Sequence, residues 1–235
     1  MVGSMCSSLK VRLLLSIIKL TSLGQAKDRQ FVDETNIPLD TIKEFLNNLA
    51  RENHIKIEDG IIKTSPEQRI NLATLAIKEG ADIERVCKAL GWREFEDLVV
   101  MILEHNGFTA RKHFRFKSTE RRYEIDALGL RDPLILSIEC KHWQRSWQRA
   151  AMIRAVEAQI ERTKALIQSF PNLKRRLKIE GERKIEILPL VLTLSETPLK
   201  ISKKVPIVPI YHFQSFLNEM QMYMSEIEAF KVKTS

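Results

Sequence analysis

Two carboxylates and one lysine stand at a spacing that suits the hydrolysis of a phosphodiester. Asp126 lies in the run YEIDAL (residues 123–128), and Glu139 and Lys141 lie in the run SIECK (residues 137–141). Because side chains alternate along a strand, Glu139 and Lys141 share one face. Carboxylate oxygens are the ligands that Mg²⁺ and Mn²⁺ prefer. A neighbouring lysine could orient an attacking water and stabilise the charge that develops on the phosphate.

The turn between these two runs determines how close the three side chains come. Asp132-Pro133 is a turn signal, and a hairpin centred on it places Asp126 opposite Glu139. A shift of one residue places Asp126 opposite Lys141 instead. Either register brings the three side chains onto one face within about 5–8 Å. A divalent cation would explain such a cluster, since unpaired burial is costly. The alternative is a structural salt bridge on an unrelated sheet.

The elements that must position this cluster are those of a mixed sheet with helices on its faces. The periodicity predicts helices and strands in the order α-β-β-β-α-β-β-α, which places this part of the chain in the α/β class. Pro206 and Pro209 suit a strand at a sheet edge. The predicted helices cover residues 94–106, 148–169 and 213–230, and the predicted strands cover residues 109–117, 122–130, 134–143, 185–194 and 205–210.

The residues before this sheet are predicted to form a separate domain. Asp59-Gly60 marks a hairpin within residues 55–63. Together with three preceding helices, the hairpin resembles a winged helix-turn-helix, an all-helical domain apart from its wing. The three helices are predicted over residues 10–23, 28–35 and 39–53. The predicted domains are a winged helix at 1–65, a helical connector at 66–91 and the α/β domain at 92–235.

The α/β domain resembles the PD-(D/E)XK nuclease superfamily, and most of all its Mrr-like restriction endonuclease and archaeal Holliday-junction-resolvase branches. The resemblance covers roughly residues 92–194 and includes the α-β-β-β-α-β core of a restriction-endonuclease-like fold. Members of the superfamily carry an aspartate on the second strand and Glu-x-Lys on the third, which Asp126, Glu139 and Lys141 match.

The same resemblance implies roles for further residues. Glu96 stands where many members carry a glutamate on the first helix, and Gln159 stands where Mrr-like members often carry a glutamine. The resemblance implies a Mg²⁺- or Mn²⁺-dependent DNA endonuclease, of restriction or of repair and recombination type, that acts as a homodimer. Asp126 and Glu139 would hold the metal, and Lys141 would serve the water and the transition state. Glu96 and Gln159 would have positioning roles in the catalytic set.

The distribution of charge agrees with a DNA partner. The formal net charge is +8, and residues 91–235 carry 25 Lys and Arg against 18 Asp and Glu. Residues 1–90 are nearly neutral, with 13 against 12. Basic side chains that flank the cluster would bind phosphates on both sides of the scissile bond. These candidates are Lys112, Arg115, Lys117, Arg121, Arg122, Arg145 and Arg149.

The predicted recognition helix at residues 39–53 leaves two interpretations open. Lys43 and Asn47 could contact DNA from this helix, but acidic side chains balance its charge. The alternative is that the winged helix mediates dimerisation or binds a helicase or another protein partner. Two further alternatives remain for the whole chain. It could be a DNA-binding regulator, or a subunit of a nucleic-acid-processing complex, with an inactive nuclease-like domain.

Other classes of protein lack support in the sequence. There is no Walker loop, no Gly-x-Gly-x-x-Gly and no serine nucleophile elbow, which argues against ATP hydrolysis and acyl transfer. The three cysteines form no C-x-x-C pair, so we expect a reducing cytoplasm without disulfides or structural zinc. The apolar run at residues 13–18 is interrupted by Lys19 and favours an amphipathic helix over a signal peptide, so no membrane partner is expected.

Overall fold

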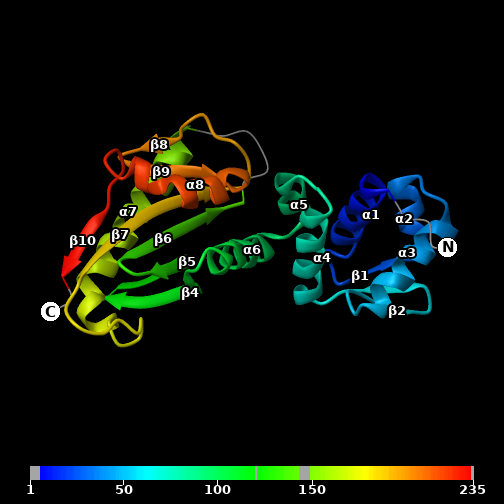
Figure 1. The fold of residues 1–235 in the computed structure, drawn as a ribbon, viewed down its shortest axis with the longest axis horizontal. Coiled ribbons are helices and arrows are strands. Elements are labelled where there is room, and N and C mark those ends of the chain that lie inside the picture. The colour runs from blue at the N-terminus through cyan, green and yellow to red at the C-terminus, as the bar shows by residue number, and fades with distance from the viewer. Residues whose placement is uncertain (1–5, 120, 143–148, 234–235) are drawn as a thin grey trace. The chain divides into compact units, whose positions relative to one another are not determined.

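The computed structural model describes residues 6–119, 121–142 and 149–233. The chain divides into two compact units, Met1–Phe95 and Glu96–Ser235 (Figure 1). The boundary falls inside the helix α6 (Trp92–His105). None of the helices within the described ranges has the length and apolarity that crossing a membrane requires.

The N-terminal unit contains helices and a small antiparallel sheet. The sheet has the strand order β1-β3-β2. The helices and the hairpin were predicted, whereas the third strand, β1, which joins the hairpin, was not. Strand β1 has only three residues, which is too short for its alternation of exposed and buried side chains to indicate a strand, and it pairs with β3. The elements are α1 (Ser7–Leu20), β1 (Gln25–Lys27), α2 (Asp28–Thr35), α3 (Leu39–Arg51), β2 (Lys56–Glu58), β3 (Ile61–Lys63), α4 (Pro66–Lys78) and α5 (Ile83–Ala89).

Apolar helix faces form the core of the N-terminal unit. Helix α3 buries Ile42, Phe45, Leu46 and Leu49, which recur at the helical spacing. Helix α4 begins with a capping box, because the Ser65 hydroxyl accepts a hydrogen bond from the backbone N–H of Gln68. Local sequence signals and one buried face per helix therefore determine these elements together.

The second unit is built around one mixed sheet. The strand order is β4-β5-β6-β7-β9-β8, and β10 also pairs with β7. Strands β4, β5 and β6 are antiparallel to one another, whereas β6, β7 and β9 are parallel. This arrangement confirms the predicted α/β class. The elements after α6 are β4 (Thr109–Ser118), β5 (Arg121–Arg131), β6 (Leu134–Lys141), α7 (Arg149–Leu173), β7 (Lys184–Thr193), β8 (Ile201–Ser202), β9 (Val205–Pro209), α8 (Ile210–Tyr223) and β10 (Phe230–Lys233).

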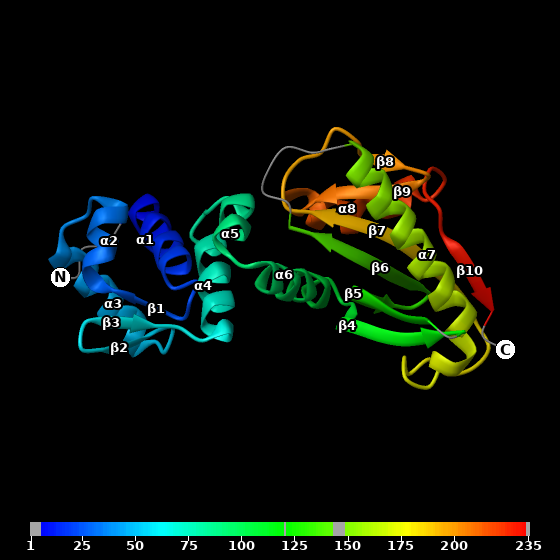
Figure 2. The same ribbon diagram turned by 180° about the vertical axis from the view of Figure 1, so that it is seen from behind.

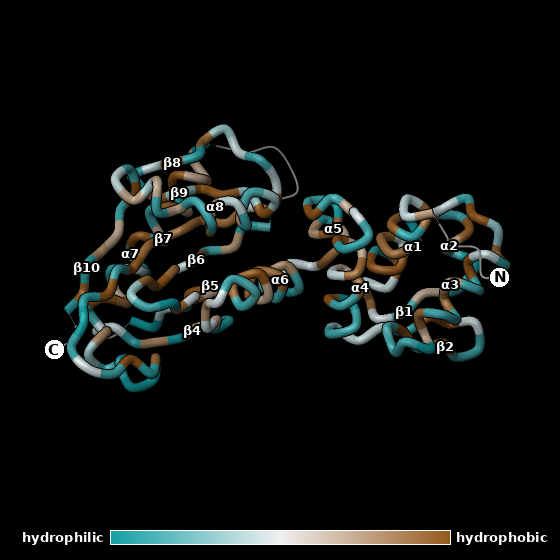
Figure 3. The backbone as a smooth tube through the Cα atoms, viewed as in Figure 1, coloured by the Kyte–Doolittle hydropathy of each residue, from teal (hydrophilic) through white to brown (hydrophobic). Residues whose placement is uncertain are grey.

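Helices α7 and α8 cover opposite faces of this sheet. Helix α8 lies in front of the strands in Figure 1, and α7 lies in front of them in Figure 2. Figure 3 shows that β7 and β9 are strongly apolar between these two layers. Under α7, Ile125, Leu128 and Ile135 of the sheet pack with Leu166 and Phe170 of the helix. The central strands are therefore buried on both faces, which explains their continuous apolar runs.

Two predicted elements differ from the structure. The strand β9 does not form the edge of the sheet, because the two-residue strand β8 pairs with its outer side. All five residues of β9 are buried. The last predicted helix ends at Tyr223 rather than at residue 230, and β10 follows it. Strand β10 pairs with β7, a distant partner that local periodicity does not reveal.

The hairpin of β5 and β6 has one of the two predicted registers. Arg131 pairs with Leu134, and Ala127 pairs with Ile138, so the turn is centred on Asp132-Pro133. The same register leads from Ala127 to Asp126 on one strand and from Ile138 to Glu139 on the other. The observed pairing therefore supports the register in which Asp126 stands opposite Glu139, and not the one in which Asp126 stands opposite Lys141.

We predict that Gly129→Ala destabilises the second unit by about 1–3 kcal/mol through overpacking. A Cβ atom at Gly129 of β5 would lie 3.0 Å from Leu103 and 3.2 Å from Phe108, so these two buried side chains would have to shift by a few tenths of an ångström. Urea denaturation of the full chain measures the change. The control is Gly91→Ala, where the added atom would have an ordinary contact at 3.5 Å. Equal effects of the two substitutions would contradict the prediction.

Candidate active site

The carboxylate of Glu139 is the most enclosed group of the predicted cluster. Its side chain is 4% exposed and lies near the end of β6. Lys141 Nζ lies 2.5 Å from Glu139 Oε1, and Arg162 of α7 lies 2.8 Å from Glu139 Oε2. Both carboxylate oxygens therefore contact a cation. This pairing compensates the loss of hydration that burial imposes on the charge.

Asp126 lies where the pairing of β5 is interrupted on both sides. The ladder to β4 passes from the pair Lys112–Ala127 to the pair Phe114–Ile125 without a pair at Asp126, and the ladder to β6 stops at Ala127. In place of backbone pairing, the backbone N–H of Cys140 donates a hydrogen bond of 2.8 Å to Asp126 Oδ2. The side chain of Asp126 thereby joins β5 to the end of β6 beside Glu139.

Glu96 contributes a third carboxylate to the site, and it lies in the N-terminal half of α6, where the second unit begins. Its side chain is 1% exposed, and neither of its oxygens has a hydrogen-bond partner within the described residues. Lys112 Nζ lies 3.7 Å and His113 Nε2 lies 3.3 Å from Glu96 Oε2. A buried carboxylate with so few partners is costly, and this cost makes Glu96 a candidate ligand or proton acceptor.

His113 links the buried Glu96 to charged groups nearer the surface. Its Nδ1 atom lies 2.9 Å from Glu124 Oε1, and Arg115 Nε lies 2.6 Å from the other oxygen of Glu124. The backbone of His113 has a φ of 50°, in the left-handed region that few residues other than glycine adopt. This conformation coincides with the gap in the ladder opposite Asp126. The sequence analysis did not assign a role to His113.

The crowding of carboxylates changes their affinity for protons. Burial and the nearby charge of Asp126 raise the pKa of Glu96 to about 7. Burial and the charge of Glu139 raise the pKa of Asp126 to about 6, although the Cys140 hydrogen bond and the cations Lys141 and Arg162 oppose the shift. Loss of hydration and repulsion between carboxylates therefore disfavour the ionised form of each of these two groups.

Gln159 occupies a different place from the carboxylates. It is fully buried on α7, and its Nε2 donates hydrogen bonds to the backbone carbonyl of Ser137 at 2.5 Å and to the Ser137 hydroxyl at 3.0 Å. Thr163 Oγ1 lies 3.1 Å from the same hydroxyl. Ser137 is two residues before Glu139, so Gln159 anchors α7 against the strand that carries Glu139.

Arg162 is the site residue that the sequence analysis missed. It lies three residues after Gln159 on α7, so the two side chains share one face of the helix. Once Gln159 is placed against β6, this spacing brings Arg162 to the same strand. The helical period was therefore the signal that could have identified it.

Some of the predicted DNA contacts gather in one pocket on β4 and β5. The pocket has a volume of about 580 Å³ and combines basic, aromatic and acidic side chains. Arg115, Lys117 and Arg122 are exposed there, and Arg149 is exposed at the start of α7. The lining residues are Arg115, Phe116, Lys117, Arg122, Tyr123 and Glu124.

Other predicted contacts lie elsewhere. Lys112 is half-buried and lies 2.7 Å from Asp97 as well as near Glu96, so it belongs to the carboxylate cluster. Arg121 lies 2.6 Å from Glu161 of α7. Arg145 is outside the described residues. On α3 of the N-terminal unit, Lys43 and Asn47 are exposed. Of the aromatic residues between the basic ones, Phe108, Phe114 and Phe116 are buried in the core, whereas Tyr123 is half-buried and lines the pocket.

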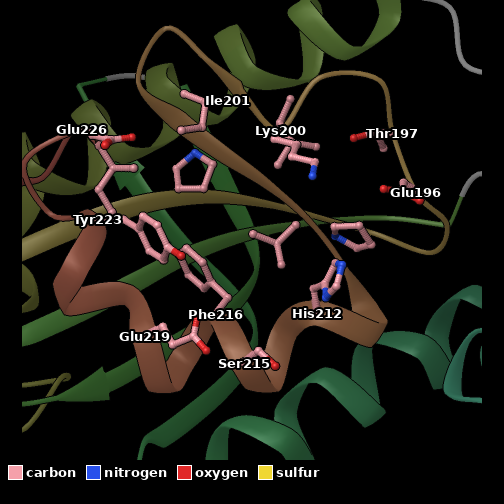
Figure 4. Close-up of a pocket in the computed structure, with 15 residues that line it drawn as sticks. Glu196, Thr197, Lys200, Ile201, His212, Ser215, Phe216, Glu219, Tyr223 and Glu226 are labelled. Atoms are coloured by element: carbon pink, nitrogen blue, oxygen red, sulfur yellow. The ribbon is translucent and has the colours of Figure 1, made fainter.

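A second pocket, of about 390 Å³, lies between α8, β9 and the segment that follows β7. Figure 4 shows Phe216, Glu219 and Tyr223 on α8 beneath Lys200 and Ile201. None of the residues of the carboxylate cluster lines it. The pocket is therefore separate from the candidate active site, and no pattern in the sequence indicated it.

We predict that Glu96→Gln stabilises the metal-free protein at pH 8 and has little effect at pH 5. The raised pKa of Glu96 means that the folded state favours the protonated form, so this stability is lost as the pH rises from about 4.5 through 7. The free energy of unfolding should rise by about 1–2 kcal/mol at pH 8 in the variant. Urea denaturation in EDTA at the two pH values measures it. An equal effect at both pH values would contradict the prediction, and the exposed Glu182→Gln is the control.

Comparisons with known proteins identify the family to which this part of the chain is similar. Residues 87–169 match the family model of the Mrr catalytic domain, which is described as a restriction endonuclease. This range contains Glu96, Asp126, Glu139, Lys141 and Gln159. An uncharacterized protein of Archaeoglobus fulgidus is 30% identical over 135 residues, which are 57% of this chain and 95% of that protein.

Two crystal structures are more distant. A protein of unknown function is 15% identical, with a TM-score of 0.35, over 56% of this chain and 67% of its own. A protein of Vibrio cholerae is 10% identical, with a TM-score of 0.39, over 94% of this chain and 53% of its own. The match to the family model and the archaeal relative carry the assignment. The chain therefore belongs to the Mrr-type restriction-endonuclease family of the PD-(D/E)XK superfamily.

Proposed function

We propose that this protein is a Mg²⁺- or Mn²⁺-dependent endonuclease that hydrolyses phosphodiester bonds in DNA, for restriction or for repair and recombination. The observation that carries the proposal is the convergence of Asp126, Glu139 and Glu96 beside Lys141. The three carboxylates come from β5, β6 and α6, so only the fold brings them together. Membership of a nuclease family and the basic second half of the chain support the same conclusion.

The chemistry of these side chains fits a hard divalent cation. Within the described residues the buried oxygens of Glu96 lack hydrogen-bond partners, and burial together with neighbouring carboxylates raises the pKa values of Glu96 and Asp126, a cost that a bound cation would relieve. Within the described residues, however, no three acidic, imidazole or thiol side chains already lie in the arrangement of a metal site. We therefore infer that Asp126 and Glu139 would hold the ion after local movement of side chains.

Lys141, Glu96 and Gln159 would have different roles in hydrolysis. When bound, the divalent cation would polarise the scissile phosphate and lower the pKa of the attacking water. Lys141, which is 28% exposed beside Glu139, would orient the water and stabilise the negative charge of the transition state. Glu96 has a pKa near neutrality and would position the water or accept its proton. Gln159 would hold β6 in place through Ser137.

The pocket on β4 and β5 provides a surface for the DNA backbone. Lys117 and Arg122 are exposed on neighbouring strands, opposite each other in the register. Their positive charges would bind phosphates and hold the duplex in a fixed position without reading its sequence. Cutting both strands of a duplex with one such site per chain would require two chains, which is the reason to propose a homodimer.

We predict that Asp126→Ala and Lys141→Ala each reduce cleavage at least about 100-fold. The assay uses labelled duplex, single-stranded, flap and four-way-junction DNA with Mg²⁺, Mn²⁺ or EDTA. Asp126→Ala removes an acidic ligand, and Lys141→Ala removes the stabilising cation. Lys184→Ala is the matched control, because Lys184 is exposed in the second Glu-x-Lys run of the chain, residues 182–184. Cleavage by the wild type in EDTA, or full cleavage by both variants, would refute the proposed function.

We propose that the N-terminal unit is a winged helix that targets the nuclease to DNA. The order α1-β1-α2-α3-β2-β3 with a three-stranded antiparallel sheet supports this proposal. Lys43 and Asn47 are exposed on α3, the helix in the position of a recognition helix. A protein partner or a second copy of the chain remains the alternative occupant of this helix.

The double substitution Lys43→Ala and Asn47→Ala should weaken duplex binding roughly tenfold, because it removes one phosphate contact and one base contact. Fluorescence anisotropy with the full chain measures the affinity. The control is Lys56→Ala and Asn71→Ala, which changes an exposed lysine and an exposed asparagine outside α3. Unchanged affinity would favour the alternative in which α3 binds protein.

A further inference from the structure

Both oxygens of Glu139 contact positive groups in the structure. Lys141 lies at one oxygen and Arg162 at the other, 2.5 Å and 2.8 Å away. A cation that binds an oxygen of Glu139 would repel both of these groups, because like charges repel strongly at such distances in a buried site, and this repulsion favours the displacement of at least one of them. Binding of the ion therefore favours movement of Lys141 or Arg162.

Arg162 is the group that can leave without disturbing the strand. Lys141 is on β6 only two residues from Glu139, whereas Arg162 reaches the carboxylate from α7. Helix α7 is held against β6 by Gln159 and Thr163, which contact Ser137. The long side chain of Arg162 can consequently turn away while its helix remains in place.

The displaced guanidinium would lie within reach of a bound phosphate. The side chain of Arg162 is 28% exposed, although the carboxylate that it contacts is 4% exposed. A guanidinium presents two parallel donors that match two phosphate oxygens, and it stays charged at every pH at which a protein is ordinarily folded. Release from Glu139 thus converts an internal ion pair into a phosphate-binding group at the edge of the site.

We propose that Arg162 is a phosphate-binding residue that stays on Glu139 until a divalent cation replaces it, so that metal and DNA strengthen each other's binding through Arg162. The inference rests on the proposed function, and it assigns Arg162 a role that neither the carboxylates nor Lys141 supply. Because such coupling is reciprocal, removal of Arg162 should lower it in both directions.

Binding of Mn²⁺ without DNA is the first test, and it uses the full chain. Arg162→Gln removes the competing charge, so the affinity for Mn²⁺ should rise roughly fivefold or more. Arg162→Lys keeps the charge and should bind Mn²⁺ as the wild type does. The matched control is Lys164→Ala, which removes an exposed charge from the same helix. Weaker Mn²⁺ binding by Arg162→Gln would overturn the proposal, since a purely structural partner of Glu139 would give that result.

Binding of duplex DNA with and without Ca²⁺ is the second test. Ca²⁺ prefers looser coordination than Mg²⁺ and is used here to load the site without cleavage, which a gel verifies. In the wild type and in Lys164→Ala, Ca²⁺ should raise DNA affinity roughly tenfold, and in Arg162→Gln the increase should fall below about twofold. Arg162→Lys should give an intermediate increase, because it lacks the paired donors.

The outcomes separate this inference from the proposed function. If the wild type binds metal and cleaves DNA but Ca²⁺ raises DNA affinity equally in Arg162→Gln and the wild type, the role of Arg162 is refuted and the nuclease stands. If the wild type neither binds metal nor cleaves, both are refuted. If Arg162→Gln does not fold, as circular dichroism would show, Arg162→Lys decides. If Ca²⁺ raised the DNA affinity of Arg162→Lys as much as that of the wild type, the proposal would be overturned.

Discussion

A buried negative charge must be compensated, and the carboxylate of Glu139 imposes this requirement on the second unit. Its two oxygens receive Lys141 from its own strand and Arg162 from α7. Removing either cation would leave an uncompensated charge in a site where water cannot replace it. The ion pair between Arg162 and Glu139 therefore joins α7 to β6. The hydrogen bonds of Gln159 to Ser137 join the same two elements.

The other two carboxylates show the opposite condition. Asp126 receives one backbone hydrogen bond from Cys140, and the oxygens of Glu96 receive none within the described residues. Burial and the charge of a neighbouring carboxylate raise the pKa values of both groups. A site that is under-compensated without metal loses stability at neutral pH but keeps ligands available for a cation. Interrupted strand pairing at Asp126 and the left-handed backbone of His113 occur at the same place.

Much of the fold was predictable because the responsible signals are local. Helical periodicity and capping residues determine α2, α3 and α4, and the Asp132-Pro133 turn determines the register of β5 and β6. The short strands β1, β8 and β10 were not predicted. Strands β1 and β10 have weak patterns of their own and pair with strands that are distant in sequence. Strand β8 has only two residues, which are too few to be recognised as a strand.

For the site, the sequence alone determined which residue types face each other across the hairpin, because alternation along two strands and one turn suffices to place Asp126, Glu139 and Lys141 together. Only the tertiary structure decided what surrounds them. Arg162 reaches Glu139 through the packing of a helix on a sheet. Lys112, predicted to bind DNA, instead lies among Glu96 and Asp97. Burial and charge pairing between distant segments depend on three-dimensional distance, which residue spacing along one chain does not contain.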